Sequence, residues 1–360
     1  MTIRLRATLV AAAAWLLASC ATQPPVPTRR PADIRAEIRH RLPPGTADRE
    51  GWAADIEKAF SELRLEADAP HLCAAIAVIG QESGFVVNPV VPGLGRIARA
   101  EIDRRAAAHH VPGFVVSAAL KLPSSQGGSY GERIAGVRTE HELSLVYDDL
   151  IGRVPLGRRL FANSNPVRTA GPMQVGIAFA EDFAREHGYP YPHASIRDEA
   201  FTRRGGVYFG VAHLLAYPVS YDRMIYRFAD YNAGRYASRN AAFQNAVAIA
   251  SGSKLALDGD LVGYGDGPGA TERAVQALAQ TLDLGERETR RALAKSGSID
   301  FERTALYERV FAHAEAIAHR KLPRAIVPDI RLKSPKITRK LTTEWFAKRV
   351  DARYRACLAL

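Results

Sequence analysis

A glutamate closes one of the most apolar segments of the chain. The stretch AVIGQESGF (77–85) ends a run from His71 that is apolar nearly all round, which is typical of a buried helix. Gly84 is a common helix terminator, so Glu82 should lie on the last turn, beside the core. Low dielectric and the negative end of the helix dipole both raise the pKa of a carboxyl group there. Such a group suits general acid catalysis; the alternative is a side chain that points into water.

Three other kinds of chemistry fail on spacing. Ser83 has glycines at −3 and +1, whereas a nucleophile elbow needs them at −2 and +2. The pair His141-Glu142 starts like a zinc-protease motif, but no second histidine follows one turn later. His109 and His110 are adjacent and point to different faces of any helix. We therefore expect no metal site.

Three short motifs follow one another in a fixed order. They are Glu82-Ser83-Gly84-Phe85 with Asn88-Pro89, then Ala170-Gly171-Pro172-Met173-Gln174-Val175, then Tyr231-Asn232-Ala233-Gly234. Together they resemble the soluble lytic transglycosylases, a family of lysozyme-like folds with the signature E-S-G-F, G-L-M-Q-[VI] and A-Y-N-A-G. The resemblance covers roughly residues 72–251 and is greatest to a bacterial lipoprotein branch of that superfamily. Pro172, Asp230 and the long chain between the first two motifs depart from the family pattern.

The resemblance implies an all-α fold with a lysozyme-like catalytic domain and a lyase activity on peptidoglycan. Glu82 would protonate the bond between N-acetylmuramic acid and N-acetylglucosamine. It would then act as base on the muramyl C6 hydroxyl, which closes a 1,6-anhydro ring without a second carboxylate, a metal or a cofactor. The altered second motif leaves an alternative open, a catalytically weak or inactive lysozyme-like lipoprotein that binds peptidoglycan or an envelope partner.

The same resemblance implies roles for five further residues. Ser83 would orient the glutamate, and Met173 and Gln174 would line the sugar cleft. Tyr231 would form a hydrogen bond near the glutamate, and Asn232 would hold the turn that follows. Two structural alternatives stand beside these roles: Met173 as a core residue, and Asn232 as part of a helix cap.

The pattern of residues at the N-terminus indicates a signal peptide. Arg4 and Arg6 precede an apolar segment (7–19) that is too short to span a bilayer as a folded helix. It ends in Leu17-Ala18-Ser19-Cys20, which resembles the lipobox of bacterial lipoproteins. Cys20 is then the expected lipidation site, with palmitate among its acyl chains. Because Ala21 follows, the sorting rule of those proteins favours the periplasmic face of the outer membrane.

The chain is basic, with a formal net charge of +11. Cleavage before Cys20 would remove Arg4 and Arg6 and lower that charge to +9. An exported lipoprotein meets no nucleic acid, so peptidoglycan glycan strands and anionic lipid headgroups are the expected partners. A merely soluble basic surface is the alternative. Nothing in the sequence indicates an oligomeric state.

Two cysteines remain once Cys20 is lipidated. Cys73 lies on the apolar helix and Cys357 near the C-terminus. In an oxidising compartment they could form a disulfide, although two buried thiols would leave the same pattern.

Periodicity and composition divide the chain into four parts. Helical patterns follow a Pro-rich segment, and a Gly-rich break precedes the last helices. The insertion could arch over the substrate cleft, with the Gly/Ser-rich turn at 124–131 as a mobile lid, or it could decorate one wall of the cleft. The parts are a signal peptide (1–19), a tether (20–45), a lysozyme-like domain (46–255) with an insertion (89–164), and a C-terminal helical extension packed on the core (256–360).

Overall fold

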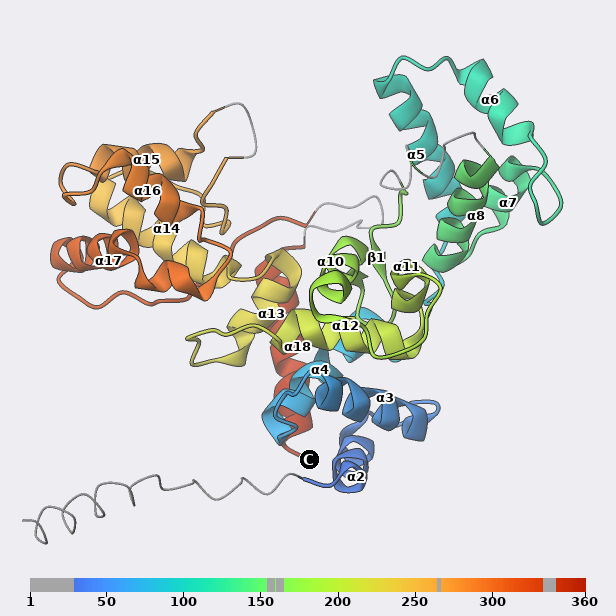
Figure 1. Ribbon diagram of the computed structural model, residues 1–360, viewed down its shortest axis with the longest axis horizontal. Helices are drawn as coiled ribbons and strands as arrows, with labels where there is room; N and C mark the ends of the chain where they lie inside the picture. Colours follow the sequence, from blue (N-terminus) through green and yellow to red (C-terminus); the bar gives the residue numbers. More distant parts are fainter. Residues whose placement is uncertain (1–28, 154–158, 160–164, 264–266, 333–340) are drawn as a thin grey trace, which may run out of the picture.

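The computed structural model describes residues 29–153, 159, 165–263, 267–332 and 341–360 (Figure 1). Over these residues it contains 16 α-helices, one 3₁₀ helix and one two-stranded sheet, which confirms the predicted all-α fold. No helix in this part of the chain is long and apolar enough to cross a bilayer. The expected signal peptide and Cys20 lie outside the described residues.

The larger hydrophobic core surrounds α4 (Ala69–Glu82). Every residue from Leu72 to Ile79 is buried, because a helix that is apolar on all sides is stable only in the interior. Asp68 caps its first turn by accepting a hydrogen bond from the backbone N–H of His71 (2.9 Å). The helices that cover α4 or complete its core are α2 (Pro31–Arg41), α3 (Arg49–Glu62), α10 (Ile177–His187), α11 (Ile196–Ala200), α12 (Arg203–Leu215), α13 (Met224–Ala233) and α18 (Thr343–Leu358).

The expected tether is helical over part of its length. Ile34 and Ile38 of α2 are buried in the larger core, together with Leu42 just beyond it. These side chains lie four residues apart, so one face of the helix packs against α3. The Pro-rich composition concealed this helix, since Pro31 occupies its first turn, where proline needs no hydrogen bond.

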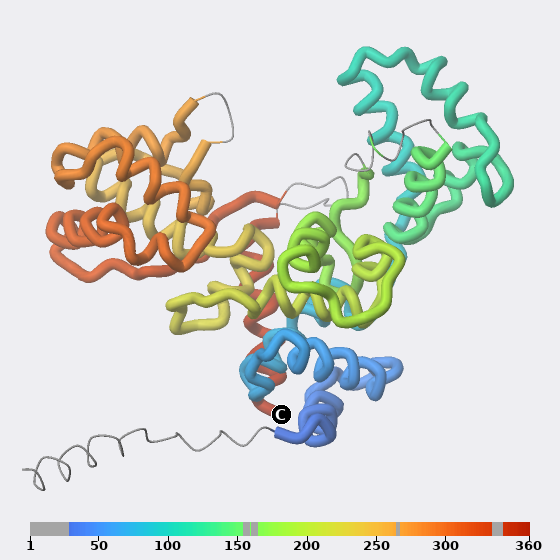
Figure 2. The backbone as a smooth tube through the Cα atoms, in the orientation of Figure 1, coloured from blue at the N-terminus to red at the C-terminus, as the bar shows by residue number. Residues whose placement is uncertain are grey.

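The last helix returns to the larger core. α18 packs against α4 and α13, so the two ends of the described chain lie side by side (Figure 2). Cys73, near the start of α4, and Cys357, near the end of α18, form a disulfide with a Cα–Cα distance of 5.6 Å. Arg353, one turn before Cys357, donates a hydrogen bond to the side chain of Gln81 at the other end of α4 (3.3 Å), so the two helices run antiparallel.

The insertion forms an arm that projects from the larger core (Figure 1). A β-bridge between Val90 and Thr139 and the stacking of His141 on Phe201 (ring centroids 4.6 Å apart) hold its base. The turn at 124–131 lies on the outer side of the arm, away from α10 and α13, so it does not cover the site as expected of a lid. The helices of the arm are α5 (Leu94–Ala108), α6 (Gly113–Lys121), α7 (Tyr130–Gly136) and α8 (Glu140–Arg153).

A second hydrophobic core forms a separate lobe. Its elements are α14 (Ala237–Ser251), α15 (Ala270–Leu278), α16 (Glu286–Leu293), η2 (Ile299–Arg303) and α17 (Ala305–Ala318). The expected boundary at residue 255 does not follow the packing, because α14 belongs to this lobe and α18 to the larger core.

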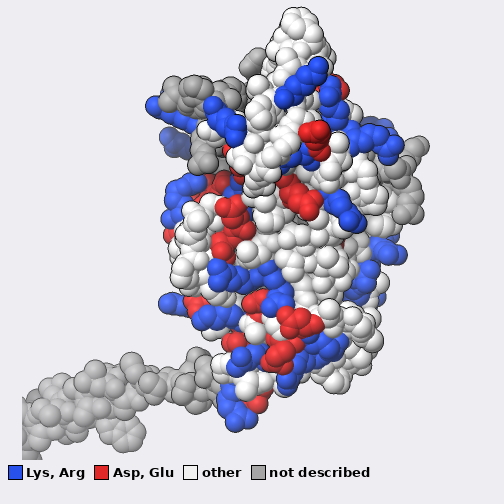
Figure 3. Space-filling model, turned by 90° about the vertical axis from the view of Figure 1, so that its right-hand side faces the viewer, with Lys and Arg blue, Asp and Glu red and all other residues white. Residues whose placement is uncertain are grey.

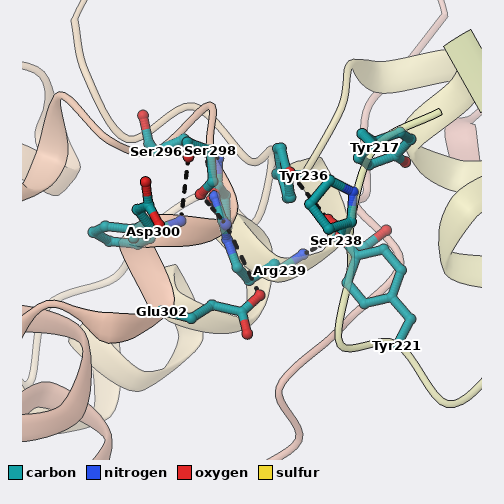
Figure 4. A network of polar contacts seen from close by, with 12 residues as sticks. Tyr217, Tyr221, Tyr236, Ser238, Arg239, Ser296, Ser298, Asp300 and Glu302 are labelled. Atoms are coloured by element: carbon teal, nitrogen blue, oxygen red, sulfur yellow. Dashed lines mark hydrogen bonds and ion pairs between the residues drawn. The ribbon is translucent and has the colours of Figure 1, made fainter. Parts of the chain in front are cut away.

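A buried guanidinium fixes one turn of the second lobe. The side chain of Arg239 is fully buried and donates hydrogen bonds to the backbone carbonyls of Ser296 and Ser298, the latter at 2.7 Å (Figure 4). Glu302 lies 3.9 Å from the same guanidinium. A buried cation is tolerated only with such partners, so this network is structural.

Candidate functional site

The three sequence motifs meet at one place in the larger core. The hydroxyl of Tyr231, on α13, donates to the backbone carbonyl of Met173 at 2.7 Å, which joins the second motif to the third. Burial and the nearby charge of Glu82 hold the pKa of Tyr231 well above its usual range, which joins the third motif to the first. Residues that are far apart in sequence thus surround the end of α4.

Glu82 is the last residue of α4 and lies at the border between core and solvent. Its side chain is partly exposed, and no described residue donates a hydrogen bond to its carboxylate. Burial raises the pKa of this carboxyl group from 4.5 to about 8. The group therefore keeps its proton near neutral pH while it remains reachable from outside, as general acid catalysis requires.

The turn after Glu82 is held in a specific conformation. Gly84 and Phe85 both have positive φ, at 59° and 66°, which is unusual for phenylalanine. The Phe85 ring packs edge-on against Trp52, with centroids 5.2 Å apart, and the Arg203 guanidinium lies 5.5 Å from the Trp52 ring centroid. This packing compensates for the strained backbone and fixes where the chain leaves the site.

Ser83 takes part in this helix end rather than in a contact with Glu82. Its hydroxyl donates to the backbone carbonyl of Ile79 at 3.1 Å. The expected role of Ser83 in orienting the glutamate is therefore absent from this conformation.

The second motif forms a hairpin between β1 (Thr169–Ala170) and β2 (Val175–Gly176). The strands are antiparallel, with Ala170 opposite Val175. The hairpin rests on α12, where Gly206 and Gly210 leave room for it. A Cβ atom added at Gly206 would lie 2.5 Å from Cδ of Pro172, and one at Gly210 would lie 2.4 Å from Sδ of Met173.

The two expected cleft residues of this hairpin differ in accessibility. Met173 is fully buried against α12, so the structural alternative holds for its side chain. Gln174 is partly exposed and has a positive φ of 51°. Its amide accepts a hydrogen bond from the Thr169 hydroxyl (3.0 Å) and donates one to the Gly171 carbonyl (3.2 Å). A substrate acetamido group would have to compete with these partners.

Asn232 is held by the C-terminal helix. Its side-chain oxygen accepts a hydrogen bond from the Thr343 hydroxyl at 2.8 Å. Thr343 is the first residue of α18 and is fully buried. The sequence did not indicate Thr343, because the two residues are 111 positions apart and no local pattern links them.

Asp230 has a structural environment. It is fully buried and accepts hydrogen bonds from the hydroxyls of Tyr217 (3.2 Å) and Tyr221 (2.7 Å) and from the backbone N–H groups of Tyr236 (3.0 Å) and Ser238 (2.7 Å). Burial raises its pKa, although these donors act in the opposite direction. Four protein donors occupy the carboxylate, so it cannot also serve a substrate.

Sequence reasoning missed two aromatic side chains, His213 beside Tyr231 and Phe179 beside His213. The His213 ring lies edge-on to both Tyr231 (5.0 Å) and Phe179 (4.7 Å). Burial lowers the pKa of His213 to about 4, so the ring is neutral near pH 7. His213 lies on α12 and Phe179 on α10, but neither belongs to a motif.

Two other features of the described residues were considered as sites. Glu66, Asp68 and His71 place ligand atoms within 4.8 Å of one another, but Asp68 already caps α4 and pairs with the His71 ring. A depression of about 350 Å³ lies on α5 and contains no residue of the three motifs. Neither feature adds a ligand to the site around Glu82.

Comparison with known proteins gives a family and one relative. A family model described as "Protein of unknown function (DUF1615)" matches residues 45–360. A protein of Escherichia coli (strain K12), described as "Uncharacterized protein YaiW", is 51% identical over 351 residues, which are 96% of this chain and 96% of that protein. No solved structure matches.

Proposed function

We propose that this chain, which belongs to the DUF1615 family, is a peptidoglycan lytic transglycosylase with a lysozyme-like catalytic domain. Neither description among its relatives names an activity, so the proposal depends on the site. The observation that carries it is Glu82, a carboxyl group at the end of a buried helix with a pKa of about 8. The convergence of the three motifs around that carboxyl group supports the same function.

The proposed reaction needs only this carboxyl group. Glu82 donates its proton to the glycosidic oxygen as the bond from that oxygen to the muramyl C1 breaks. The resulting carboxylate then accepts the proton of the muramyl C6 hydroxyl, and the C6 oxygen bonds to C1 of the same sugar. The proton lost in the first step is regained, and no water is consumed. Proximity within one sugar replaces an external nucleophile.

The surroundings of Glu82 fit a single-acid mechanism. Asp230, the other carboxylate in the motifs, is occupied by four protein donors and cannot activate a water molecule. Tyr231 lies beside Glu82, and its hydroxyl already donates a hydrogen bond to the Met173 carbonyl of the hairpin. It would therefore maintain the position of the hairpin relative to the acid.

The location of the protein is part of the same proposal. Cys20 would carry acyl chains and anchor the chain to the periplasmic face of the outer membrane, within reach of glycan strands. Residues 21–28 lie outside the described part and would connect the lipid to α2.

Digestion of purified sacculi tests the proposal. The chain from Ala21 onward, without acyl groups, should release fragments that mass spectrometry identifies by 1,6-anhydromuramyl ends. Glu82→Gln should abolish release, whereas Glu62→Gln, at the exposed end of the equally long α3, should not. Reducing ends would indicate a hydrolase, and anhydro ends from the Glu82→Gln variant would contradict the assignment of the acid.

The binding-only alternative is favoured by one observation. Met173 is buried and the Gln174 amide has protein partners, so the hairpin offers the substrate less than the family motif implies. Under this alternative, the wild-type chain would co-sediment with sacculi and release no fragment.

A further inference from the structure

The helix α6 exposes an almost entirely apolar face. It spans nine residues and packs on α5 and α7 through two buried side chains, Val116 and Leu120. Of its exposed residues only Lys121 is charged, and the Phe114 side chain is 76% exposed. Its other exposed residues are Gly113, Val115, Ala118 and Ala119.

The exposed apolar surface continues beyond both ends of α6. Val111 precedes the helix and Leu122 follows it, and both are exposed. In Figure 3 the top of the arm is uncharged, with Lys and Arg side chains just below it. Exposed apolar side chains that gather at one place mark a surface that meets another apolar phase.

The charge beside this surface is positive. Between residues 94 and 122 there are five Lys and Arg residues against two acidic ones, and both His109 and His110 are exposed. Glu101 and Asp103, the two acidic residues, pair with arginines of the same helix, so five cations and two anions leave an excess of three positive charges. A partner should therefore be apolar where it meets α6 and anionic around that contact.

We propose that the tip of the arm, α6 with Val111 and Leu122, docks on the surface of an anionic lipid bilayer. Phe114 and Val115 would enter the boundary between headgroups and acyl chains, and Lys121 and the basic side of α5 would face anionic headgroups. The proposal is independent of the activity at Glu82, because the tip lies at the outer end of the arm.

Two other occupants fit the surface less well. A glycan needs several hydrogen-bonding side chains, and α6 offers only Lys121, which is exposed, and Ser117, which is partly exposed. A second copy of the chain would need to bury about 800 Å² on each side, more than a helix roughly 14 Å long can supply. It would also bring two basic surfaces together.

Vesicle binding tests the proposal. The chain from Ala21 onward keeps every contact described here, because these lie within residues 29–360. It should co-sediment with vesicles of phosphatidylglycerol and phosphatidylethanolamine and bind phosphatidylcholine vesicles much more weakly, and salt should weaken the binding. The double variant Phe114→Ser, Val115→Ser should lower the partition coefficient roughly tenfold or more.

A matched variant distinguishes this contact from non-specific hydrophobic binding. Ile317→Ser changes another exposed apolar side chain, on α17 in the second lobe, and should bind as the wild type does. Because Phe114 is largely exposed, its substitution should leave the circular dichroism and melting temperature unchanged. In a Phe114→Trp variant, brominated lipids should quench fluorescence beyond the quenching seen in the wild type.

Several results would overturn the proposal. They are an absence of binding to anionic vesicles, binding of the double variant as strong as that of the wild type, and fluorescence quenching in the Phe114→Trp variant no greater than in the wild type. A dimer in light scattering that the double variant abolishes would assign the surface to a second copy instead.

Discussion

The pKa of Glu82 makes a quantitative prediction about stability. Below pH 4.5 the carboxyl group is protonated in both the folded and the unfolded chain. Between pH 4.5 and about 8 the unfolded chain loses this proton while the folded chain keeps it, so the free energy of unfolding falls as pH rises. The slope is about 1.4 kcal/mol per pH unit.

Glu82→Gln removes this penalty because glutamine does not titrate. At pH 7 the variant should be more stable than the wild type by about 3 kcal/mol at most, and solvent at the partly exposed carboxyl group should reduce that gain. At pH 4.5 the two proteins should be equally stable. Above pH 8 the difference should no longer grow, because Glu82 is then ionised in both states.

Urea unfolding at a series of pH values measures this difference. Glu62→Gln provides the control, since Glu62 also ends a 14-residue helix but is exposed and paired with Lys58. A carbon-13 NMR titration of Glu82 in the wild type gives its pKa directly. A stability difference that does not change with pH, or a Glu82 that titrates near 4.5, would refute the reasoning.

Four more outcomes follow. Release of anhydro fragments should fall about tenfold per pH unit above pH 8, because the acid must be protonated; a rate that keeps rising through pH 9 contradicts this. Asp230→Asn should lower the free energy of unfolding by about 2–4 kcal/mol, since an amide cannot accept from all four donors, yet leave the activity of the folded fraction nearly intact. Replacing Cys73 and Cys357 by serine should cost up to about 6 kcal/mol in the chain-entropy model for a separation of 284 residues; an unchanged melting temperature would argue against the disulfide. Cys20→Ser should leave the chain unprocessed or released from the membrane, and intact-mass analysis of the membrane fraction distinguishes these forms from an acylated chain.

The sequence by itself determined the elements and the position of the acid. An apolar run from Leu72 to Ile79 can be stable only as a buried helix, so the burial of α4 and the place of Glu82 at its end followed from local pattern. The all-α class followed in the same way. The two cysteines left after Cys20 made one pairing possible, but the sequence could not distinguish a disulfide from two free thiols.

Only the tertiary structure decided which side chains face the site. Periodicity records that a residue is buried, but not which distant element covers it, because that depends on packing between segments far apart in the chain. Met173 turned toward the space left by Gly210, four donors converged on Asp230, and Thr343 reached Asn232 from the last helix. The division into two cores was decided in the same way, since α18 closes the larger core only after the second lobe has intervened in the chain.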